Sequence, residues 1–226
     1  MSTSDPSARP ASLPVLVTGA SRGLGAALAE RLAARGNHVV AVARTQGALE
    51  ELDDRIQAAG GSATLAPLDI TEDGAMQHLC RDIHDRWGGL SAWMHTAIHA
   101  APLTPVPMID PKDLARTLEL NVTALSRLIG YVAPLLAASG GGRAVFFDDD
   151  RSARYAGAYA ASKAAQRVLV EAWAAESTTP GAPEIHLLTP RPMPTAVRAR
   201  FHPGENRDAL ARPADEARRL LEPLGL

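Results

Sequence analysis

A tyrosine and a lysine stand four residues apart in the segment "YAASK", residues 159–163. In a helix this spacing places Tyr159 and Lys163 on one face. A free tyrosine has a pKa of about 10, and acid–base work near neutral pH needs a pKa roughly 3 units lower. A lysine ammonium group close by shifts the tyrosine pKa in that direction. The pair is a candidate for proton transfer, although the same spacing also occurs in ordinary helix pairs.

Three consecutive aspartates, residues 148–150, end the apolar run "RAVFF" shortly before this pair. An ionised carboxylate beside Tyr159 would raise the tyrosine pKa and repel an alkoxide that forms at the hydroxyl group. In the alternative interpretation, the three acids are a solvated strand end that Arg151 and Arg154 neutralise.

A glycine-rich turn, "TGASRGLG" (residues 18–25), follows the first apolar run. Gly19, Gly23 and Gly25 would permit a tight turn, close backbone approach to a phosphate, and close contact between strand and helix. The following helix would offer its free N–H groups and the positive end of its dipole to a pyrophosphate. This context favours a dinucleotide site over a glycine-rich turn without a ligand.

The end of the second apolar run distinguishes between two nicotinamide cofactors. A site that prefers NAD(H) places Asp or Glu there, to bond the ribose 2′-hydroxyl group. Here the run ends in "VVAVART" without an acid; Arg44 lies at that end, and Arg22 lies within the glycine turn. Because two guanidinium groups suit a 2′-phosphate, we expect NADP(H), unless both arginines are solvated surface charges.

These residues depend on a regular alternation of strands and helices. Apolar runs typical of buried strands lie at residues 13–18, 38–43, 62–70, 90–97, 143–148 and 184–190. Amphipathic stretches typical of helices lie at residues 24–36, 47–61, 72–88, 112–138 (with a kink expected at Pro134), 158–177 and 212–226. The order predicts one doubly wound α/β domain at residues 13–226, with a Rossmann-like parallel sheet of six strands and helices on both faces. Residues 1–12 are expected to be a flexible tail.

Composition limits the classes of function. The 226 residues are 46% apolar and carry a net charge of −2, so nothing indicates a nucleic-acid partner or a membrane-surface role. No apolar run approaches the roughly 20 residues of a membrane span, and the start of the chain has no secretory pattern. The one cysteine, Cys80, fits a reducing compartment, and there is no CxxC or HExxH metal pattern. We expect a cytoplasmic protein without a metal site.

Five segments, in order, resemble the short-chain dehydrogenase/reductase family: "TGASRGLG", "LDI" (68–70), "LELNVTA" (118–124), "YAASK" and "TPRPMPT" (189–195). The resemblance implies hydride transfer between a nicotinamide and a substrate carbon, with Tyr159 handling the proton of the substrate oxygen. It implies that Lys163 also binds the nicotinamide ribose, that Asn121 holds a water linking Lys163 to solvent, and that Asp69 meets the adenine. The expected cofactor-binding residues are Gly19, Ser21, Arg22, Gly23, Leu24, Gly25, Arg44, Asp69, Ile70, Ala97, Tyr159, Lys163 and Thr195.

The sequence departs from that family on the substrate side of the site. The family places a serine near the end of the fifth strand to hold the substrate oxygen, and by alignment of "GRAVFFDDD" on that strand we expect Asp149 to take this position. Ser152 is the nearest hydroxyl, but we expect it to lie too far along the loop. Either Asp149 is protonated, or it points elsewhere, or the substrate brings its own donor, because a carboxylate accepts well from a hydroxyl or an amine. The catalytic candidates are Tyr159, Lys163, Asn121 and Asp149.

Further departures surround the expected position of the nicotinamide. Ile98 and Arg191 each replace a family glycine, and we expect Arg191 to add bulk and charge on the nicotinamide side. His95 and His99 are candidate acid–base groups, although such histidines are more often packed or solvated. The chain ends in "LEPLGL", where the family continues into a seventh strand, so we expect that strand to be missing.

Two functions remain open. One is an NADP(H)-dependent oxidoreductase that interconverts a carbonyl and an alcohol of a small-molecule substrate through Tyr159 and Lys163. The other is an NADP(H)-binding protein of the same fold whose catalysis is lost or weak, which the altered serine position and the two replaced glycines favour. By resemblance we expect a homodimer through the helices at residues 112–138 and 159–177. No motif identifies the substrate, although the charged segment "RARFHPGENRD" would suit a polar or anionic one.

Overall fold

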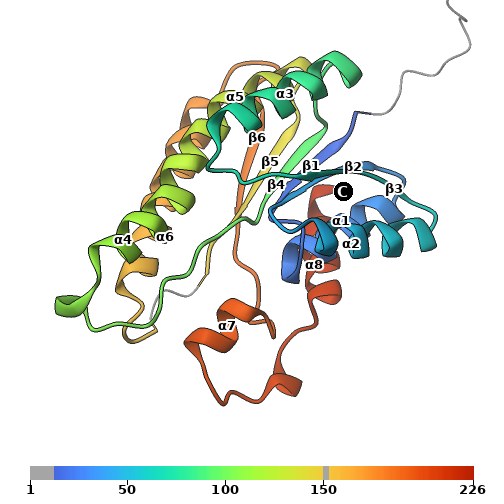
Figure 1. The fold of residues 1–226 in the computed structure, drawn as a ribbon. Coiled ribbons are helices and arrows are strands. Elements are labelled where there is room, and N and C mark those ends of the chain that lie inside the picture. The colour runs from blue at the N-terminus through green and yellow to red at the C-terminus, as the bar shows by residue number, and fades with distance from the viewer. Residues whose placement is uncertain (1–12, 150–152) are drawn as a thin grey trace, which may run out of the picture.

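The computed structural model describes residues 13–149 and 153–226, which form one parallel sheet between two layers of helices (Figure 1). The expected tail at residues 1–12 lies outside the described residues. The same holds for residues 150–152, and therefore for Ser152 and the proposed neutralising role of Arg151.

The sheet has six strands in the order β3-β2-β1-β4-β5-β6. The strands are β1 (Val15–Thr18), β2 (His38–Ala43), β3 (Ser62–Pro67), β4 (Ala92–His95), β5 (Arg143–Phe147) and β6 (Glu184–Leu188). This confirms the predicted Rossmann-like sheet of six strands. Strand order reverses between β1 and β4, and such a switch point opens a crevice at the carboxyl ends of the strands.

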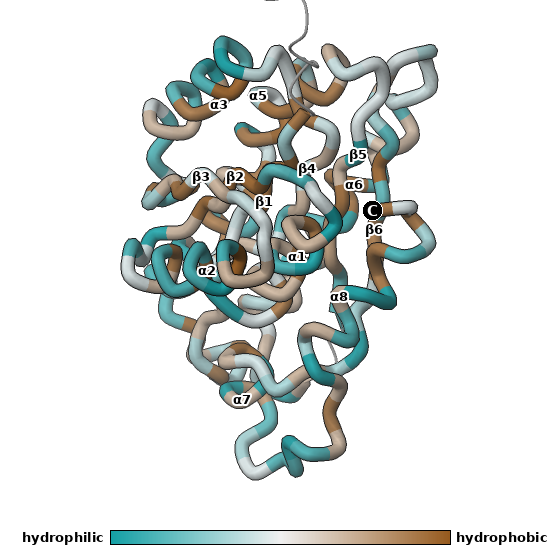
Figure 2. Tube along the Cα trace, turned by 90° about the vertical axis from the view of Figure 1, so that its right-hand side faces the viewer, coloured by the Kyte–Doolittle hydropathy of each residue, from teal (hydrophilic) through white to brown (hydrophobic). Residues whose placement is uncertain are grey.

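The central strands are apolar on both faces because both faces are covered. Val15 and Val17 of β1 pack on one side of the sheet and Leu16 packs on the other, and all three are fully buried. A strand of this kind loses the apolar–polar alternation of a half-exposed strand, which is why the sequence shows continuous apolar runs. In Figure 2 the brown, hydrophobic colour gathers on the strands, whereas α2 (Gln46–Ala58) is largely teal.

The helices divide between the two faces of the sheet (Figure 1). Those on one face are α1 (Gly23–Ala34), α2 and α8 (Pro213–Leu221). Those on the other are α3 (Asp73–Trp87), α5 (Leu125–Ala138) and α6 (Gly157–Glu176), with α4 (Pro111–Leu118) continuing the line of α5. The short helix α7 (Ala196–Phe201), which was not predicted, lies below the carboxyl ends of the strands in Figure 1.

The long helical region expected at residues 112–138 contains a π-helical segment, Glu119–Ala124, between α4 and α5. The α-helix then runs on through Pro134 to Ala138. π-Helical turns inside α-helices are rare and frequently occur at functional sites, because the wider turn re-aims a side chain. Here the segment carries Asn121.

Contrary to the expectation that no apolar run approaches the length of a membrane span, one helical stretch among the described residues, Pro111–Ala138, is long and apolar enough to cross a membrane by length and composition alone. A buried core helix passes the same test. Leu125, Leu128 and Val132 of this stretch are buried in the core between the helix and the sheet. These three side chains make the contacts of a helix that packs in a protein core.

Candidate active site

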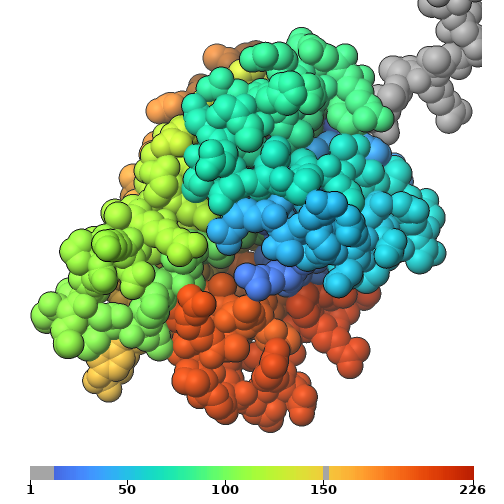
Figure 3. Space-filling view, in the orientation of Figure 1, coloured from blue at the N-terminus to red at the C-terminus, as the bar shows by residue number. Residues whose placement is uncertain are grey.

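A cavity of about 720 Å³ opens at the carboxyl ends of β1, β2, β4 and β5. The turn between β1 and α1, the first turns of α6, and the segment after β6 also line it. In Figure 3 the orange-red surface around α7 borders the green surface of the connection before α4, and a hydrogen bond from Arg200 to the carbonyl oxygen of Ala100 joins the two. Every predicted cofactor-binding residue lines this cavity, and so does Asp149.

The glycine turn lies too close to the end of β4 for any larger residue. Gly19 has a φ of +86°, and a Cβ atom there would lie 2.5 Å from the backbone nitrogen of Ala97. A Cβ atom on Gly25 would lie 2.3 Å from the carbonyl oxygen of Gly19. The first residues of α1, Gly23 to Gly25, line the cavity, and no side chain caps this helix end. Such a helix N-terminus fits an anionic group such as a pyrophosphate.

Two arginines stand at the adjacent rim. Arg22 and Arg44 are both exposed and line the cavity. Nη1 of Arg44 lies 3.7 Å from Oδ2 of Asp69, and the other carboxylate oxygen of Asp69 accepts hydrogen bonds from the backbone N–H and hydroxyl group of Thr71. The arrangement brings Arg44 and Asp69 together, a pairing that the sequence did not indicate.

Tyr159 lies in the first turn of α6 and is 2% exposed. Its hydroxyl group donates a hydrogen bond to Oδ2 of Asp149. Its ring packs edge-on against the ring of Phe201 from α7, with the centroids 4.9 Å apart. Of the alternatives left open for Asp149, the one in which it points away from the tyrosine is therefore wrong.

The pKa of Tyr159 is raised above its ordinary value, first by burial and then by the charge and hydrogen bond of Asp149 and the charge of Asp148. This is the opposite of the shift expected from Lys163. The physical reason is that an ionised tyrosine would be a second negative charge at a buried position beside a carboxylate. In this structure Tyr159 holds its proton.

Lys163 is 3% exposed and lies one turn after Tyr159. Its Nζ donates to the carbonyl oxygen of Phe147 and to Oε1 of Gln166, each at 2.5 Å. Gln166 is equally buried, and its role was missed, although its i, i+3 spacing from Lys163 was a usable signal. The two oxygens fix the ammonium group beside the end of β5, where it faces the cavity.

Asn121 is fully buried and does not line the cavity. Its Oδ1 accepts from the backbone N–H of His99 at 2.7 Å, and its Nδ2 donates to the carbonyl oxygen of His99 and to Oγ of Ser162, both at 2.8 Å. Ser162 in turn donates to the carbonyl oxygen of Tyr159 at 2.7 Å. The amide group of Asn121 thus ties the connection after β4 to the helix that carries Tyr159. Its role in a proton relay stays a prediction.

The two candidate histidines are not equivalent. His95 is 2% exposed, and its Nδ1 lies 2.8 Å from Oγ1 of Thr18. Burial and then the charge of Lys163 lower the pKa of His95 to about 3, so it is neutral near pH 7 and cannot act there as an acid. His99 is half-buried and contributes its backbone to Asn121. Although His95 and His99 have a spacing of four, the described residues contain no group of three or more potential metal ligands.

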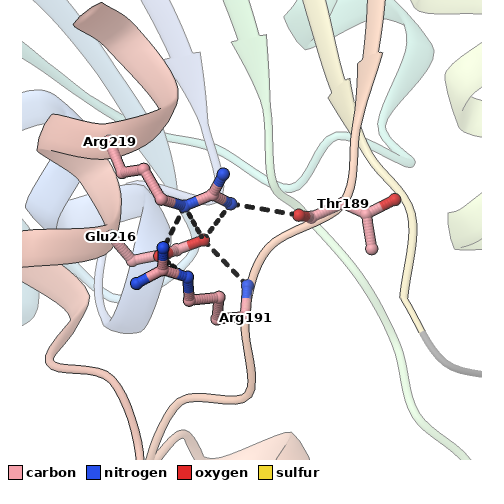
Figure 4. A network of polar contacts seen from close by, with 4 residues as sticks. All are labelled: Thr189, Arg191, Glu216 and Arg219. Carbon is pink, nitrogen blue, oxygen red and sulfur yellow. Dashed lines mark hydrogen bonds and ion pairs between the residues drawn. The ribbon is translucent and has the colours of Figure 1, made fainter.

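Arg191 does not simply add charge on the nicotinamide side. Its backbone N–H donates to Oε1 of Glu216 at 2.8 Å, and its Nε lies 4.0 Å from Oε2 of the same carboxylate (Figure 4). Arg219 also donates to Glu216, at 3.0 Å from Nε to Oε2, and to the carbonyl oxygen of Thr189 at 3.2 Å. Glu216 of α8 is 1% exposed, and these contacts outweigh its burial to lower its pKa. The network fixes the chain after β6, which the sequence did not predict.

Comparison with known proteins agrees with this geometry. A family model described as short chain dehydrogenase matches residues 14–206. A fatty acyl-CoA reductase of Acinetobacter baylyi is 33% identical over 155 residues, which are 66% of this chain and 52% of that protein. The chain spans about half the length of curated relatives that it matches.

Solved structures show the same fold. The short chain dehydrogenase from Shigella flexneri has a TM-score of 0.84 and 28% identity, covering 90% of this chain and 82% of that one. A metagenomic short-chain oxidoreductase in complex with NADP has a TM-score of 0.79 and 25% identity, covering 96% and 91%.

Proposed function

Because the chain belongs to the short chain dehydrogenase family, we propose that it is an NADP(H)-dependent oxidoreductase that interconverts a carbonyl and an alcohol of a small-molecule substrate. One observation carries the proposal. The glycine turn, both rim arginines, Tyr159 and Lys163 line a single cavity at the switch point of the sheet, although they come from distant parts of the sequence.

The cavity fits a nicotinamide dinucleotide by the chemistry of its walls. The first turn of α1 would hold the pyrophosphate, at the place where a Cβ atom on Gly25 cannot be accommodated. Arg22 and Arg44 would hold a 2′-phosphate, Asp69 would contact the adenine, and Lys163 would hold the nicotinamide ribose. The relative that was solved with NADP supports this choice of cofactor.

When bound, the reduced cofactor would supply a hydride to the substrate carbon. The protein's part is to hold the substrate and manage the proton. The hydroxyl group of Tyr159 would bind the substrate oxygen and donate its proton there, while Phe201 and the buried wall exclude water. Lys163, fixed by Phe147 and Gln166, would stabilise negative charge on this side of the site.

A second function, an NADP(H)-binding protein with weak or lost catalysis, is favoured by one observation. The hydroxyl group that would donate a hydrogen bond to a substrate donates one to Asp149 instead, and the raised pKa of Tyr159 weakens it as an acid. Both functions share the cofactor site and differ only in whether the tyrosine supports turnover.

The remaining expectations are part of the same proposal. A homodimer would form through the outer faces of the helices at residues 112–138 and 159–177, where Val168 of α6 is 63% exposed. A cytoplasmic location, and the lack of a nucleic-acid or membrane partner, stay predictions. Sedimentation analysis of the purified chain tests the dimer: a monomer at micromolar concentration would contradict it.

Two measurements test the function. Calorimetry with NADPH and NADH should show preferential binding of NADPH, and no heat with either would contradict both functions. NADPH oxidation is then followed against ketones, quinones and acyl carbonyls for the natural protein and Tyr159→Phe. Turnover that depends on the tyrosine supports the oxidoreductase, whereas tight NADPH binding without such turnover supports the binding protein.

A further inference from the structure

The carboxylate of Asp149 stands where the reduction of a carbonyl would build negative charge. Asp149 is hydrogen-bonded to the hydroxyl oxygen of Tyr159. A substrate oxygen that accepts a hydrogen bond from Tyr159 would lie one hydrogen-bond length from the same hydroxyl oxygen. Two hydrogen bonds of about 2.7 Å place the substrate oxygen within roughly 5 Å of the carboxylate. At that separation two like charges repel strongly in a buried site.

Apolar neighbours and a second acid strengthen this effect, whereas the ammonium group of Lys163, which Phe147 and Gln166 hold at the cavity, opposes it. The ring of Phe201 packs on Tyr159, Met193 is buried in the wall, and Ile98 stands where the resemblance expects a glycine. Asp148, the neighbour of Asp149, adds a second acid near the tyrosine. Apolar walls reduce screening by water, so the sign of the charge on the reacting group decides how well it binds.

A cationic electrophile reverses the sign of the interaction. A protonated carbon–nitrogen double bond carries its positive charge at the nitrogen, and its N–H group is a donor that a carboxylate accepts well. We propose that this site reduces an iminium ion, a protonated C=N bond, in preference to a ketone of the same shape, with Asp149 holding the N–H group. The inference rests on the proposed function, since it needs the reduced nicotinamide as hydride donor.

The step balances without a proton from the protein. The electron pair of the hydride forms the new C–H bond, the π pair of the C=N bond becomes the lone pair of nitrogen, and the product is a neutral amine. When bound, the reduced nicotinamide would supply this hydride by losing one of its C–H bonds and would be oxidised, while the C=N bond is reduced. Tyr159 therefore keeps its proton throughout and orients Asp149, which agrees with its raised pKa.

The primary test compares two ring-matched probes on the natural protein, 2-methyl-1-pyrroline and cyclopentanone, by NADPH oxidation. We expect kcat/KM to be at least roughly tenfold higher for the imine, because the carboxylate attracts one reacting group and repels the other. This comparison requires no variant. Equal rates, or a faster ketone, would overturn the inference and leave the proposed carbonyl reduction in place. NADPH that binds but reacts with neither probe would overturn both.

Variants identify the residue responsible. Asp149→Asn keeps the shape and removes the charge, and we expect it to lower kcat/KM for the imine by about 30-fold or more while ketone reduction rises. The control is Glu171→Gln, which removes the charge of an exposed acid of α6 that pairs with Arg167 and does not line the cavity, and it should leave the ratio of the two rates unchanged.

A binding measurement separates charge recognition from turnover. In the presence of NADP⁺, 2-methylpyrrolidine, which is protonated near neutral pH, should bind the natural protein at least roughly tenfold more tightly than cyclopentanol. Asp149→Asn should abolish this preference while NADP⁺ affinity and thermal unfolding stay unchanged. A preference for the amine that survives in Asp149→Asn would show that another group holds the cation, and the assignment to Asp149 would be wrong.

Discussion

The hydroxyl group of Tyr159 donates to Oδ2 of Asp149, a residue ten positions earlier in the segment that follows β5. The contact joins a proton donor to a carboxylate inside the cavity that holds the predicted cofactor residues. It makes the tyrosine a weaker acid.

Replacing the carboxylate with a hydroxyl group should restore ordinary reductase behaviour. We expect Asp149→Ser to raise the rate of ketone reduction by roughly tenfold, since it removes a like charge from beside the forming alkoxide. NADPH oxidation with a ketone measures the effect. Glu171→Gln, which removes an exposed acid of α6, is the control and should change nothing. An unchanged or slower rate in Asp149→Ser would contradict the placement of Asp149 at the substrate.

The pH dependence of the reverse reaction reports on the tyrosine. Alcohol oxidation needs a tyrosinate as the base, and the fraction of tyrosinate rises with pH. Because the pKa of Tyr159 is raised above its ordinary value of about 10, the rate should keep rising through the alkaline range without a plateau. In Asp149→Ser the rise should move to lower pH. A plateau near neutral pH in the natural protein would show that Tyr159 ionises readily.

His95 should make the protein sensitive to acid. Its pKa is about 3 in the folded chain against 6.5 ordinarily, so the unfolded chain binds more protons between those values. The free energy of unfolding should therefore fall as pH falls from 6.5 to 3, by up to about 5 kcal/mol for this residue. Urea unfolding at pH 7 and pH 4 measures the loss. His95→Asn should show a smaller loss, whereas His78→Asn, at an exposed position, should match the natural protein.

The network around Glu216 should be needed to position the cofactor wall. Glu216→Ala leaves the N–H group of Arg191 and the guanidinium group of Arg219 without their acceptor. We expect the free energy of unfolding to fall by about 1–3 kcal/mol and NADPH binding to weaken. The expected loss of stability is smaller than for a fully buried ion pair because Arg219 is partly exposed. Denaturant unfolding and calorimetry measure the two effects.

A matched surface pair is the control for that change. Glu184→Ala removes the partner of Arg143 at the start of β5 and should cost no more than about 1 kcal/mol. If Glu184→Ala and Glu216→Ala were equally mild, the network would have no special positioning role.

Arg44 should select between the two nicotinamide cofactors. We expect Arg44→Ser to weaken NADPH binding by roughly tenfold or more and to leave NADH binding nearly unchanged, because only NADPH carries the 2′-phosphate. Calorimetry with both cofactors measures the ratio. Arg55→Ser, at an exposed arginine of α2 that pairs with Glu30, is the control. An equal effect on both cofactors would show that Arg44 supports the fold through Asp69 instead.

The fold and the cofactor turn could be predicted from the sequence because their signals are local. Continuous apolar runs indicated strands buried on both faces, and Gly19 and Gly25 indicated a turn with no room for a side chain. The π-helical segment around Asn121 and the short helix α7 were not predicted. A change of one residue in helical register, or a helix of only six residues, leaves little trace in the hydrophobic periodicity of the sequence.

The sequence by itself determined which groups the site would contain: a tyrosine, a lysine, an asparagine and an aspartate in place of a hydroxyl. Only the tertiary structure decided how they act on one another. In the folded chain Tyr159 is hydrogen-bonded to Asp149, and Lys163 is hydrogen-bonded to Phe147 and Gln166. The backbone of Arg191 is hydrogen-bonded to Glu216, which lies 25 residues later in the sequence. The reason is physical: spacing along a chain limits which side chains can share a face, but burial and the nearest charge set a pKa, and both depend on segments far apart in sequence.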